Sequence, residues 1–379
     1  MTSHRSSPLH PLRTVERPAF EEGDGPLRIV DLFSGCGGLT LGVAQAAASH
    51  GLALDVRLAV DFDEAAVGVY RANFPKAHTQ LAAVETLVDA PLGSDLSTAE
   101  EALAIAVGNP VHALVAGPPC QGHSDLNNHT RRSDPKNELY LRVARAAEVL
   151  RPRAVMIENV PAVKHDRANV VSATISQLEQ LGYQVHDSVV GLDRLGVAQR
   201  RRRHVLVAVT SDMTPPAVLL GGLGQVDARD LRWAIGDLAD IAEPQGWDRP
   251  SRVSADNLAR MRWLLDHDAF DLPNDLRPRC HQGNHSYKSM YGRLRWDQPA
   301  QTVTSGFGSI GQGRYMHPDQ PRALTPHEAA RIQGFPDYFR FEQVASRGAL
   351  ATMIGNAVPP ALGLAIFDAL IPEMGITAR

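Results

Sequence analysis

The stretch "LRIVDLFSGCGGLTLGVAQAAASHG", residues 27–51, joins an apolar run, a glycine-rich turn and a second apolar run. Residues 27–32 predict a buried strand and residues 39–51 a helix. Between them Gly35, Gly37 and Gly38 would let backbone amides at a helix N-terminus approach a ligand closely. A tight strand-to-helix turn without a ligand has the same pattern, so the turn alone leaves both interpretations open.

The alternation of strand and helix continues through the first 200 residues. Because short apolar strands separated by helices require crossover connections, the pattern predicts an α/β fold with a doubly wound, mostly parallel sheet. The further strands are expected at 56–60, 111–117, 154–157 and 204–209, and the helices at 63–74, 137–150 and 173–182.

The pattern ends near residue 210, where Pro, Gly, Asp and Arg become frequent, and an apolar helix is expected again at 359–372. We therefore predict one domain from 28–209 and 352–379, and a small loop-rich domain at 210–351. Residues 1–27 are polar, aperiodic and rich in proline, which predicts a disordered arm, with a clamp on a partner as the alternative.

The composition excludes several classes of protein. The chain has 379 residues, 44% of them hydrophobic, and a net charge of −4, so any nucleic-acid surface must be a local patch. Three cysteines, Cys36, Cys120 and Cys280, do not suggest a disulfide framework or a C-x-x-C metal site, so we expect no metal. We see no secretory signal and no apolar run of about 18 residues, and expect a cytoplasmic protein without a membrane partner.

Chemically useful side chains follow the predicted strands. Asp61 follows the strand at 56–60, Cys120 the strand at 111–117, and Glu158 the strand at 154–157. Ligands of parallel sheets bind beyond the carboxyl ends of the strands, where these groups would gather with the glycine turn. Any one of them could be an ordinary turn residue, but their joint occurrence favours a site.

Asp61 is suited to accept hydrogen bonds from ribose hydroxyls. Phe33 and Phe62 could each offer a ring to an adenine, or could pack in the core. Cys120 follows two prolines on a polar loop, which favours a reactive nucleophile over a buried structural thiol. Glu158 could share a proton with a substrate, or could cap the turn in "ENVPA".

The run "QRRRR", residues 199–203, precedes a strand. Arg201 and Arg203 would alternate onto one face of that strand, toward anions or carboxylates. Together with Arg131 and Arg132 they could contact a nucleic-acid backbone, and a solvated basic patch is the alternative.

These pieces, in this order, resemble the cytosine-5 DNA methyltransferase family from about residue 28 to 370. The similar motifs are "DLFSGCGGL" (31–39), "GPPCQGHS" (117–124), "ENV" (158–160), "QRRRR", "RLRWDQPAQTVTSG" (293–306), "RALTPHEAARIQGFPDYF" (322–339) and "IGNAVPP" (354–360).

The resemblance implies a Rossmann-like catalytic domain and S-adenosyl-L-methionine as cofactor. It implies methyl transfer to carbon 5 of a flipped-out cytosine in a short specific site of duplex DNA, through a covalent Cys120 adduct. Glu158 would bind the cytosine ring edge, Arg203 its carbonyl oxygen, and Arg201 would brace the site. Gln199 is the first residue of the same catalytic motif.

Further positions follow from the resemblance. The cofactor positions are Phe33, Ser34, Gly35, Gly37, Gly38, Asp61, Phe62, Pro118, Leu139, Asn356 and Val358. The DNA-contacting positions are Gln121, Ser124, Arg131, Arg132, Arg293 and Thr304. The small domain would recognise the target sequence, with "LRPRCHQGNHSYKSMYGR" (276–293) rich in residues that reach phosphates and bases.

The chain departs from the family pattern in two places. "QLAAVETL" (80–87) lacks the aspartate that would contact the adenine amine, and His123 stands in an unusually polar loop. We expect a monomer, and the resemblance allows a cognate restriction endonuclease as a partner. The alternatives are an RNA methyltransferase on the same scaffold, which would carry a Cys-Phe-Thr signature that we do not find, and a catalytically silent DNA-binding homologue.

Overall fold

The computed structural model describes residues 10–119, 139–165, 169–224, 226–283 and 289–376. The chain forms two compact units, which we call the sheet unit and the small unit. The sheet unit comprises Ala19–Gly196, Arg201–Asp227 and Ala357–Arg379, and the small unit comprises Met1–Pro18, Val197–Arg200 and Ala228–Asn356.

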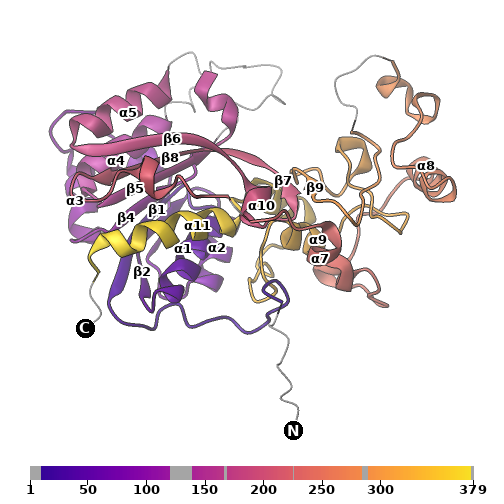
Figure 1. Cartoon of the computed structure of the whole chain (residues 1–379), viewed down its shortest axis with the longest axis horizontal. Coiled ribbons are helices and arrows are strands. Elements are labelled where there is room, and N and C mark those ends of the chain that lie inside the picture. Colours follow the sequence, from indigo (N-terminus) through magenta and orange to yellow (C-terminus); the bar gives the residue numbers. More distant parts are fainter. Residues whose placement is uncertain (1–9, 120–138, 166–168, 225, 284–288, 377–379) are drawn as a thin grey trace, which may run out of the picture. The chain divides into compact units, whose positions relative to one another are not determined.

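A seven-stranded sheet with the order β3-β2-β1-β4-β5-β8-β6 forms the centre of the sheet unit (Figure 1). All neighbouring strands are parallel except β8, which is antiparallel to both β5 and β6. The predicted mostly parallel sheet is therefore confirmed. The strands are β1 (Pro26–Leu32), β2 (Ala53–Asp61), β3 (Thr79–Leu81), β4 (Ala113–Ala116), β5 (Ala154–Asn159), β6 (Tyr183–Gly191) and β8 (Arg202–Thr210).

Helices cover the two faces of this sheet, α1 and α11 on one and α3, α4 and α5 on the other (Figure 1). Periodicity predicted α1, α2, α4, α5 and α11 to within a few residues, but it missed α3, β3 and β6. The helices of this unit are α1 (Gly38–Ser49), α2 (Glu64–Asn73), α3 (Thr98–Val107), α4 (Leu139–Leu150), α5 (Val170–Gln180), α6 (Pro216–Leu219) and α11 (Pro360–Leu370).

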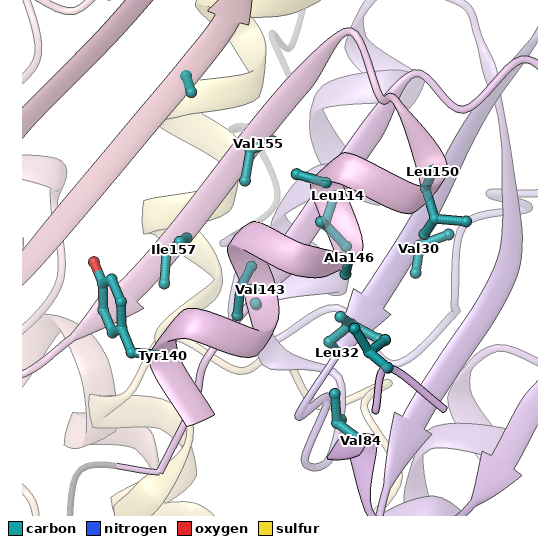
Figure 2. Close-up of a cluster of buried hydrophobic side chains, with 14 of the residues drawn as sticks. Val30, Leu32, Val84, Leu114, Tyr140, Val143, Ala146, Leu150, Val155 and Ile157 are labelled. Carbon is teal, nitrogen blue, oxygen red and sulfur yellow. The ribbon is translucent and has the colours of Figure 1, made fainter. Parts of the chain in front are cut away.

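The core between the sheet and α4 is built from aliphatic side chains. Val143, Ala146 and Leu150 of α4 pack against Leu114 and Ile157 of the strands, and all five are at most 4% exposed (Figure 2). A fully buried Val, Leu or Ile contributes about 1.5–3 kcal/mol, so this layer anchors the carboxyl ends of the central strands.

Helices α1 and α11 lie on the other face of the sheet and pack against each other at two glycines. A Cβ at Gly42 would overlap the carbonyl oxygen of Pro360, and one at Gly363 would lie 2.6 Å from the carbonyl oxygen of Leu39. By length and composition alone the segment Arg347–Met374 could cross a membrane, which we did not expect. However, α11 begins only at Pro360, and its Leu362, Ile366 and Phe367 are buried in the sheet unit. We therefore interpret α11 as a core helix.

The small unit has short elements joined by long irregular segments. Its helices are α7 (Leu231–Ile235), α8 (Ala255–Asp266), α9 (Pro326–Ile332) and α10 (Arg347–Asn356), and β7 (Gln199–Arg200) pairs in parallel with β9 (Ala300–Gln301). Met261, Leu264, Leu272, Tyr291, Ile310 and Met316 form a separate small core.

The N-terminal segment corrects the prediction of a disordered arm over residues 1–27. Residues 1–9 lie outside the described part, but Leu12 and Phe20 are only 6% and 2% exposed. The Asp337 amide donates to the Leu12 carbonyl at 2.9 Å, and the Leu54 amide donates to the Phe20 carbonyl at 2.6 Å. Isolated apolar residues at irregular spacing have no helical or strand period, so the sequence pattern did not reveal their burial.

The unit boundaries also differ from the predicted small domain at 210–351. The small unit begins at Ala228, ends at Asn356 and takes in Val197–Arg200 and residues from the N-terminal segment. Residues 211–227 stay with the sheet unit, where the Thr214 hydroxyl donates to Glu373 at 3.0 Å.

Candidate active site

The glycine turn after β1 has three residues in the left-handed region: Phe33 (φ 56°), Gly35 (φ 53°) and Gly37 (φ 90°). A Cβ at Gly37 would lie 2.8 Å from the Phe74 ring, so only glycine fits there. A Cβ at Gly35 would meet nothing within 4 Å. The turn is therefore tightly packed at Gly37 and open at Gly35. Gly38 begins α1 directly after it.

Asp61 links the end of β2 to this turn. Its carboxylate accepts hydrogen bonds from the amides of Gly35 at 2.8 Å and Asp63 at 2.9 Å. Burial raises the pKa of Asp61, and these two amides oppose the rise. A carboxylate has about four lone-pair sites, so Asp61 can still accept from a ligand hydroxyl. Beside it the side chain of Phe62 is 71% exposed.

The sequence pattern did not predict a group of three buried polar residues near the turn. The Thr40 hydroxyl donates to Asp31 at 2.6 Å, and the Tyr70 hydroxyl donates to Thr40 at 2.9 Å. All three residues are at most 1% exposed, and burial raises the pKa of Asp31 to about 7. An acidic residue inside the apolar run "LRIVDL" was the available signal. Nearby, burial raises the pKa of Cys36 to about 12, so this thiol is unreactive.

The corner after β4 brings three predicted groups together. A Cβ at Gly117 would lie 3.8 Å from Glu158 Oε2, 3.7 Å from Val358 Cγ2 and 3.9 Å from the Phe33 carbonyl oxygen. The Asn159 amide donates to the Pro118 carbonyl at 3.4 Å, which ties the corner to the end of β5. Cys120, Gln121, His123, Ser124, Arg131 and Arg132 lie outside the described residues.

Glu158 and Arg203 form a short ion pair with 2.5 Å between Oε1 and Nε. Their side chains are only 9% and 11% exposed, so the pair is largely shielded from water. Arg201 is 3% exposed and donates to the Ala357 carbonyl at 3.4 Å, whereas Arg200 and Arg202 are exposed. The arginines therefore alternate in burial, as the strand period predicted.

Four predicted site residues belong to the small unit. Gln199 is fully buried, donates to Gln333 at 2.5 Å and accepts from the Val303 amide at 2.9 Å. Arg293 pairs with Asp268 at 3.0 Å and donates to the Pro318 carbonyl. Thr304 hydrogen-bonds the Tyr315 hydroxyl at 2.9 Å, and Asn356 is the exposed last residue of α10. Each of the first three is thus engaged inside its own unit.

Comparison with known proteins identifies the family. The family model for C-5 cytosine-specific DNA methylase matches residues 27–372. The chain belongs to this family. The type II methyltransferase M1.BsuMI of Bacillus subtilis (strain 168) is 42% identical to this methylase over 93% of the chain and 82% of its own length. The type II methylase M.HgiDII of Herpetosiphon aurantiacus is 32% identical over 89% of the chain and 93% of its own length.

Solved structures share the fold. A prophage-encoded protein (E. coli) has a TM-score of 0.65 at 23% identity and covers 92% of the methylase and 99% of its own chain. The S. pombe Dnmt2 methyltransferase has a TM-score of 0.62 at 16% identity, with 91% and 99% covered.

The methylase is accordingly an enzyme, a DNA (cytosine-5-)-methyltransferase that uses S-adenosylmethionine as methyl donor. The residues around the glycine turn fit this cofactor. Gly35 leaves an open face, Asp61 offers acceptor lone pairs, and Phe62 presents an exposed ring. Sequence reasoning found all three of these residues and missed the Asp31–Thr40–Tyr70 group beneath them.

Proposed function

We propose that this methylase acts on a flipped-out cytosine in duplex DNA through a covalent bond to Cys120. The observation that supports the proposal best is the Glu158–Arg203 ion pair beside the Gly117–Pro118 corner that leads to Cys120. A carboxylate and a guanidinium at the mouth of the sheet match the ring edge of a cytosine. The base must leave the duplex stack, because carbon 6 is out of reach of a thiolate inside it.

Cys120 supplies the nucleophile. Its thiolate forms a bond to carbon 6, and the ring electrons move to carbon 5, which becomes nucleophilic. When bound, S-adenosylmethionine would supply an electrophilic methyl group, with S-adenosylhomocysteine as the leaving group. After transfer a base removes the carbon 5 proton, the electrons of that C–H bond restore the ring double bond, and the C–S bond breaks to release the thiolate.

Glu158 and Arg203 act on the ring as a pair. Arg203 holds Oε1 of Glu158, while Oε2 is the oxygen nearer the Gly117 corner. This arrangement leaves Oε2 to bind ring nitrogen 3 and the exocyclic amine and to share a proton as the adduct forms. The guanidinium has five N–H donors, so Arg203 can also donate to the ring carbonyl. Arg201 braces the Ala357 carbonyl next to Val358.

At the cofactor positions Asp61 would bind the ribose hydroxyls and Phe62 would stack on the adenine. Ser34, Pro118, Leu139 and Val358 would complete the pocket of the sheet unit, and Asn356 stays a proposed cofactor contact on the evidence of its motif. The segment that follows β3 lacks an aspartate, and the Ala82 amide donates to the Asp61 carbonyl at 3.0 Å. We therefore expect a weaker contact with the adenine amine than an aspartate would give.

The small unit would recognise the target sequence. Arg295 is exposed and lies 3.5 Å above the centroid of the Phe270 ring, and Arg260 lies 5.9 Å above the Tyr291 ring. Stacked arginines are held ready to bind phosphates or guanine edges. Arg295 is a better candidate for DNA contact than Arg293, whose guanidinium is engaged with Asp268. Thr304 and the loop residues Gln121, Ser124, Arg131 and Arg132 stay proposed DNA contacts.

We propose that the enzyme binds duplex DNA as a monomer in the cytoplasm. The type II names of two relatives support a restriction endonuclease as its biological partner. An enzyme with such a partner would methylate the sequence that the endonuclease cuts.

The test uses duplex DNA and labelled S-adenosylmethionine. We expect label in 5-methylcytosine after digestion, and a covalent complex when 5-fluorocytosine replaces the target base. Cys120→Ala should abolish both, while Cys280→Ala, a matched change at the exposed cysteine of the small unit, should abolish neither. Label in transfer RNA but not in DNA would establish the RNA alternative, and trapping by Cys120→Ala would remove Cys120 as the nucleophile.

A further inference from the structure

A second polar cluster lies on the other face of the strands that carry Glu158 and Arg203. Asp187 Oδ2 accepts from Lys164 Nζ at 2.8 Å and from His204 Nε2 at 3.0 Å. His204 is fully buried, and the Asp187 side chain is 23% exposed. None of these three residues belongs to the proposed machinery or to the motifs that identified the family.

The sheet register places the two groups on opposite faces. Glu158 pairs with Val205, and the neighbouring Asn159 pairs with His204. Because successive side chains of a strand alternate, the Glu158–Arg203 pair occupies one face, and Asn159 and His204 occupy the other. The face with His204 also carries Leu206 of the α4 core. The cluster is therefore directly behind the ion pair.

The cluster joins the chain segments that carry the two catalytic groups. Lys164 lies on the 3₁₀ turn Pro161–His165, which begins three residues after Glu158. His204 follows Arg203 on β8. A single oxygen of Asp187, on β6, holds both. Movement of the Glu158 segment relative to the Arg203 strand would break one of these two hydrogen bonds.

The protonation states of Asp187 and His204 allow a fixed hydrogen bond between them. Burial would raise the pKa of Asp187, but hydrogen bonds from Lys164 and His204 hold it below its ordinary value, so the carboxylate is ionised. Burial lowers the pKa of His204. An ionised carboxylate only accepts, so the neutral imidazole donates from Nε2. Its Nδ1 is buried and has no hydrogen-bond partner in the described part of the chain.

That buried nitrogen is costly to stability. A buried polar atom without a partner costs about 1–3 kcal/mol, and β8 could hold an apolar residue there, as it does at Leu206 and Ala208. A hydrogen bond to a charged group contributes about 1.5–3 kcal/mol, so the orphaned nitrogen offsets much of what the bond to Asp187 adds to stability. The donation to Asp187 is then better explained by the geometry of the strand ends.

We propose that Lys164, Asp187 and His204 are positioning residues that hold the Glu158 segment and the Arg203 strand in register for catalysis. The proposal rests on the proposed role of the Glu158–Arg203 pair. The cluster does not touch the substrate. It acts through the two segments that it ties together, and a loss of it misplaces the pair rather than removing it.

The test compares kcat, KM and thermal midpoint in the full-length enzyme. His204→Leu and Asp187→Asn should each lower kcat about tenfold, because small misplacements of reacting groups are costly, with both KM values within twofold of wild type. His204→Gln keeps an N–H donor for Asp187. Its kcat should therefore lie no more than about threefold below that of wild type, against about tenfold for His204→Leu. Lys164→Met should lower kcat about threefold.

Asp212→Asn is the matched control. Arg153 and Asp212 form an ion pair of 2.8 Å at the opposite end of β5 and β8, so its loss perturbs the same two strands away from the site. Its kcat should equal that of wild type. Should His204→Leu fail to fold, Lys164→Met and Asp187→Asn carry the test, because their side chains are partly exposed.

Three results would overturn the proposal: unchanged kcat in Asp187→Asn and Lys164→Met, equal losses in His204→Gln and His204→Leu, or an equal loss in Asp212→Asn. Glu158→Gln in the same assay separates the two hypotheses. If Glu158→Gln is inactive while the cluster variants are normal, only the positioning role fails. If Glu158→Gln is fully active, the proposed function of the Glu158–Arg203 pair fails, and the positioning role that rests on it fails too.

Discussion

The sheet unit and the small unit satisfy their buried polar groups in different ways. In the sheet unit the strands β1, β4 and β5 pair with one another residue by residue, and their side chains are mostly Val, Ile, Leu and Ala. In the small unit the irregular backbone is held by charges. Arg331, only 2% exposed, binds Asp337 and Asp237, and Arg322 binds the buried Glu328 through both of its terminal nitrogens.

His327 shows the same device in the small unit. Its ring stacks on Trp247 at 4.0 Å, and its two nitrogens lie 2.7 Å from Asp248 and 2.9 Å from Asp337. The sheet unit uses a buried charge pair at α3, whose Glu100 binds Arg145 of α4 at 2.6 Å. At α3 and in the small unit, buried charges therefore supply contacts where no strand pairing is present.

The largest expected effect tests whether methyl transfer depends on the Glu158 carboxylate of β5 in the sheet unit. Glu158→Gln should lower kcat by about 10²–10⁴-fold, because the amide cannot share a proton with the ring. Steady-state kinetics with labelled cofactor measure it. Glu373→Gln, which alters the contact with Thr214 in the same unit, is the control and should be near wild type. A kcat for Glu158→Gln within tenfold of wild type would contradict the assignment.

The next effect tests the dependence of the sheet unit on close backbone packing. Gly42→Ala should lower the free energy of unfolding by about 3 kcal/mol, because the new methyl overlaps the Pro360 carbonyl. Helix propensity alone would raise it by about 1 kcal/mol, so the sign decides between packing and propensity. Chemical denaturation measures the change. Gly348→Ala in α10, where a Cβ has space, should be neutral or stabilising.

A third effect tests the charges of the small unit. Burial would raise the pKa of Asp337, but His327 and Arg331 lower it from 3.8 to about 2. Its stabilisation is therefore present above pH 3.8 and is lost as the pH falls through 2. Asp337→Asn should cost about 2 kcal/mol at pH 7.

Urea denaturation of Asp337→Asn and wild type across pH measures this difference. The gap between the two proteins should narrow as the pH falls from about 4 toward 2. Asp266→Asn on the exposed side of α8 is the control and should show no gap at any pH. A gap that does not change with pH would mean that packing, rather than charge, accounts for the loss.

The smallest effect concerns an exposed side chain at the sheet edge. Phe62→Ala should weaken S-adenosylhomocysteine binding by about fivefold, since one aromatic stack is worth about 1 kcal/mol. Stability should stay within about 0.5 kcal/mol of wild type, because the ring is 71% exposed. Calorimetry measures both. Ile105→Ala, at an 82% exposed residue of α3, should change neither. Equal affinity in Phe62→Ala would leave the ring without a cofactor role.

Several features could be read from the sequence because they depend on local order. Apolar runs of strand and helix length predicted five of the sheet strands, and the turn at 35–38, Asp61 and Glu158 followed from what stands at the strand ends. Other signals were present but unused. Ser97 and Glu100 form a capping box that marks the start of α3, and β6 has intermediate burial at nearly every position, so it lacks a clear alternation.

The sequence by itself determined the family, the mostly parallel sheet, the glycine turn and the candidate site residues, because periodicity and motif order are properties of the chain alone. Only the tertiary structure decided which partners those residues take. It paired Arg203 with Glu158, engaged Arg293 inside the small unit, buried Leu12 and Phe20, and placed the Lys164–Asp187–His204 cluster behind the site. These contacts join residues far apart in sequence, and strand register and burial, which no local pattern encodes, bring them together.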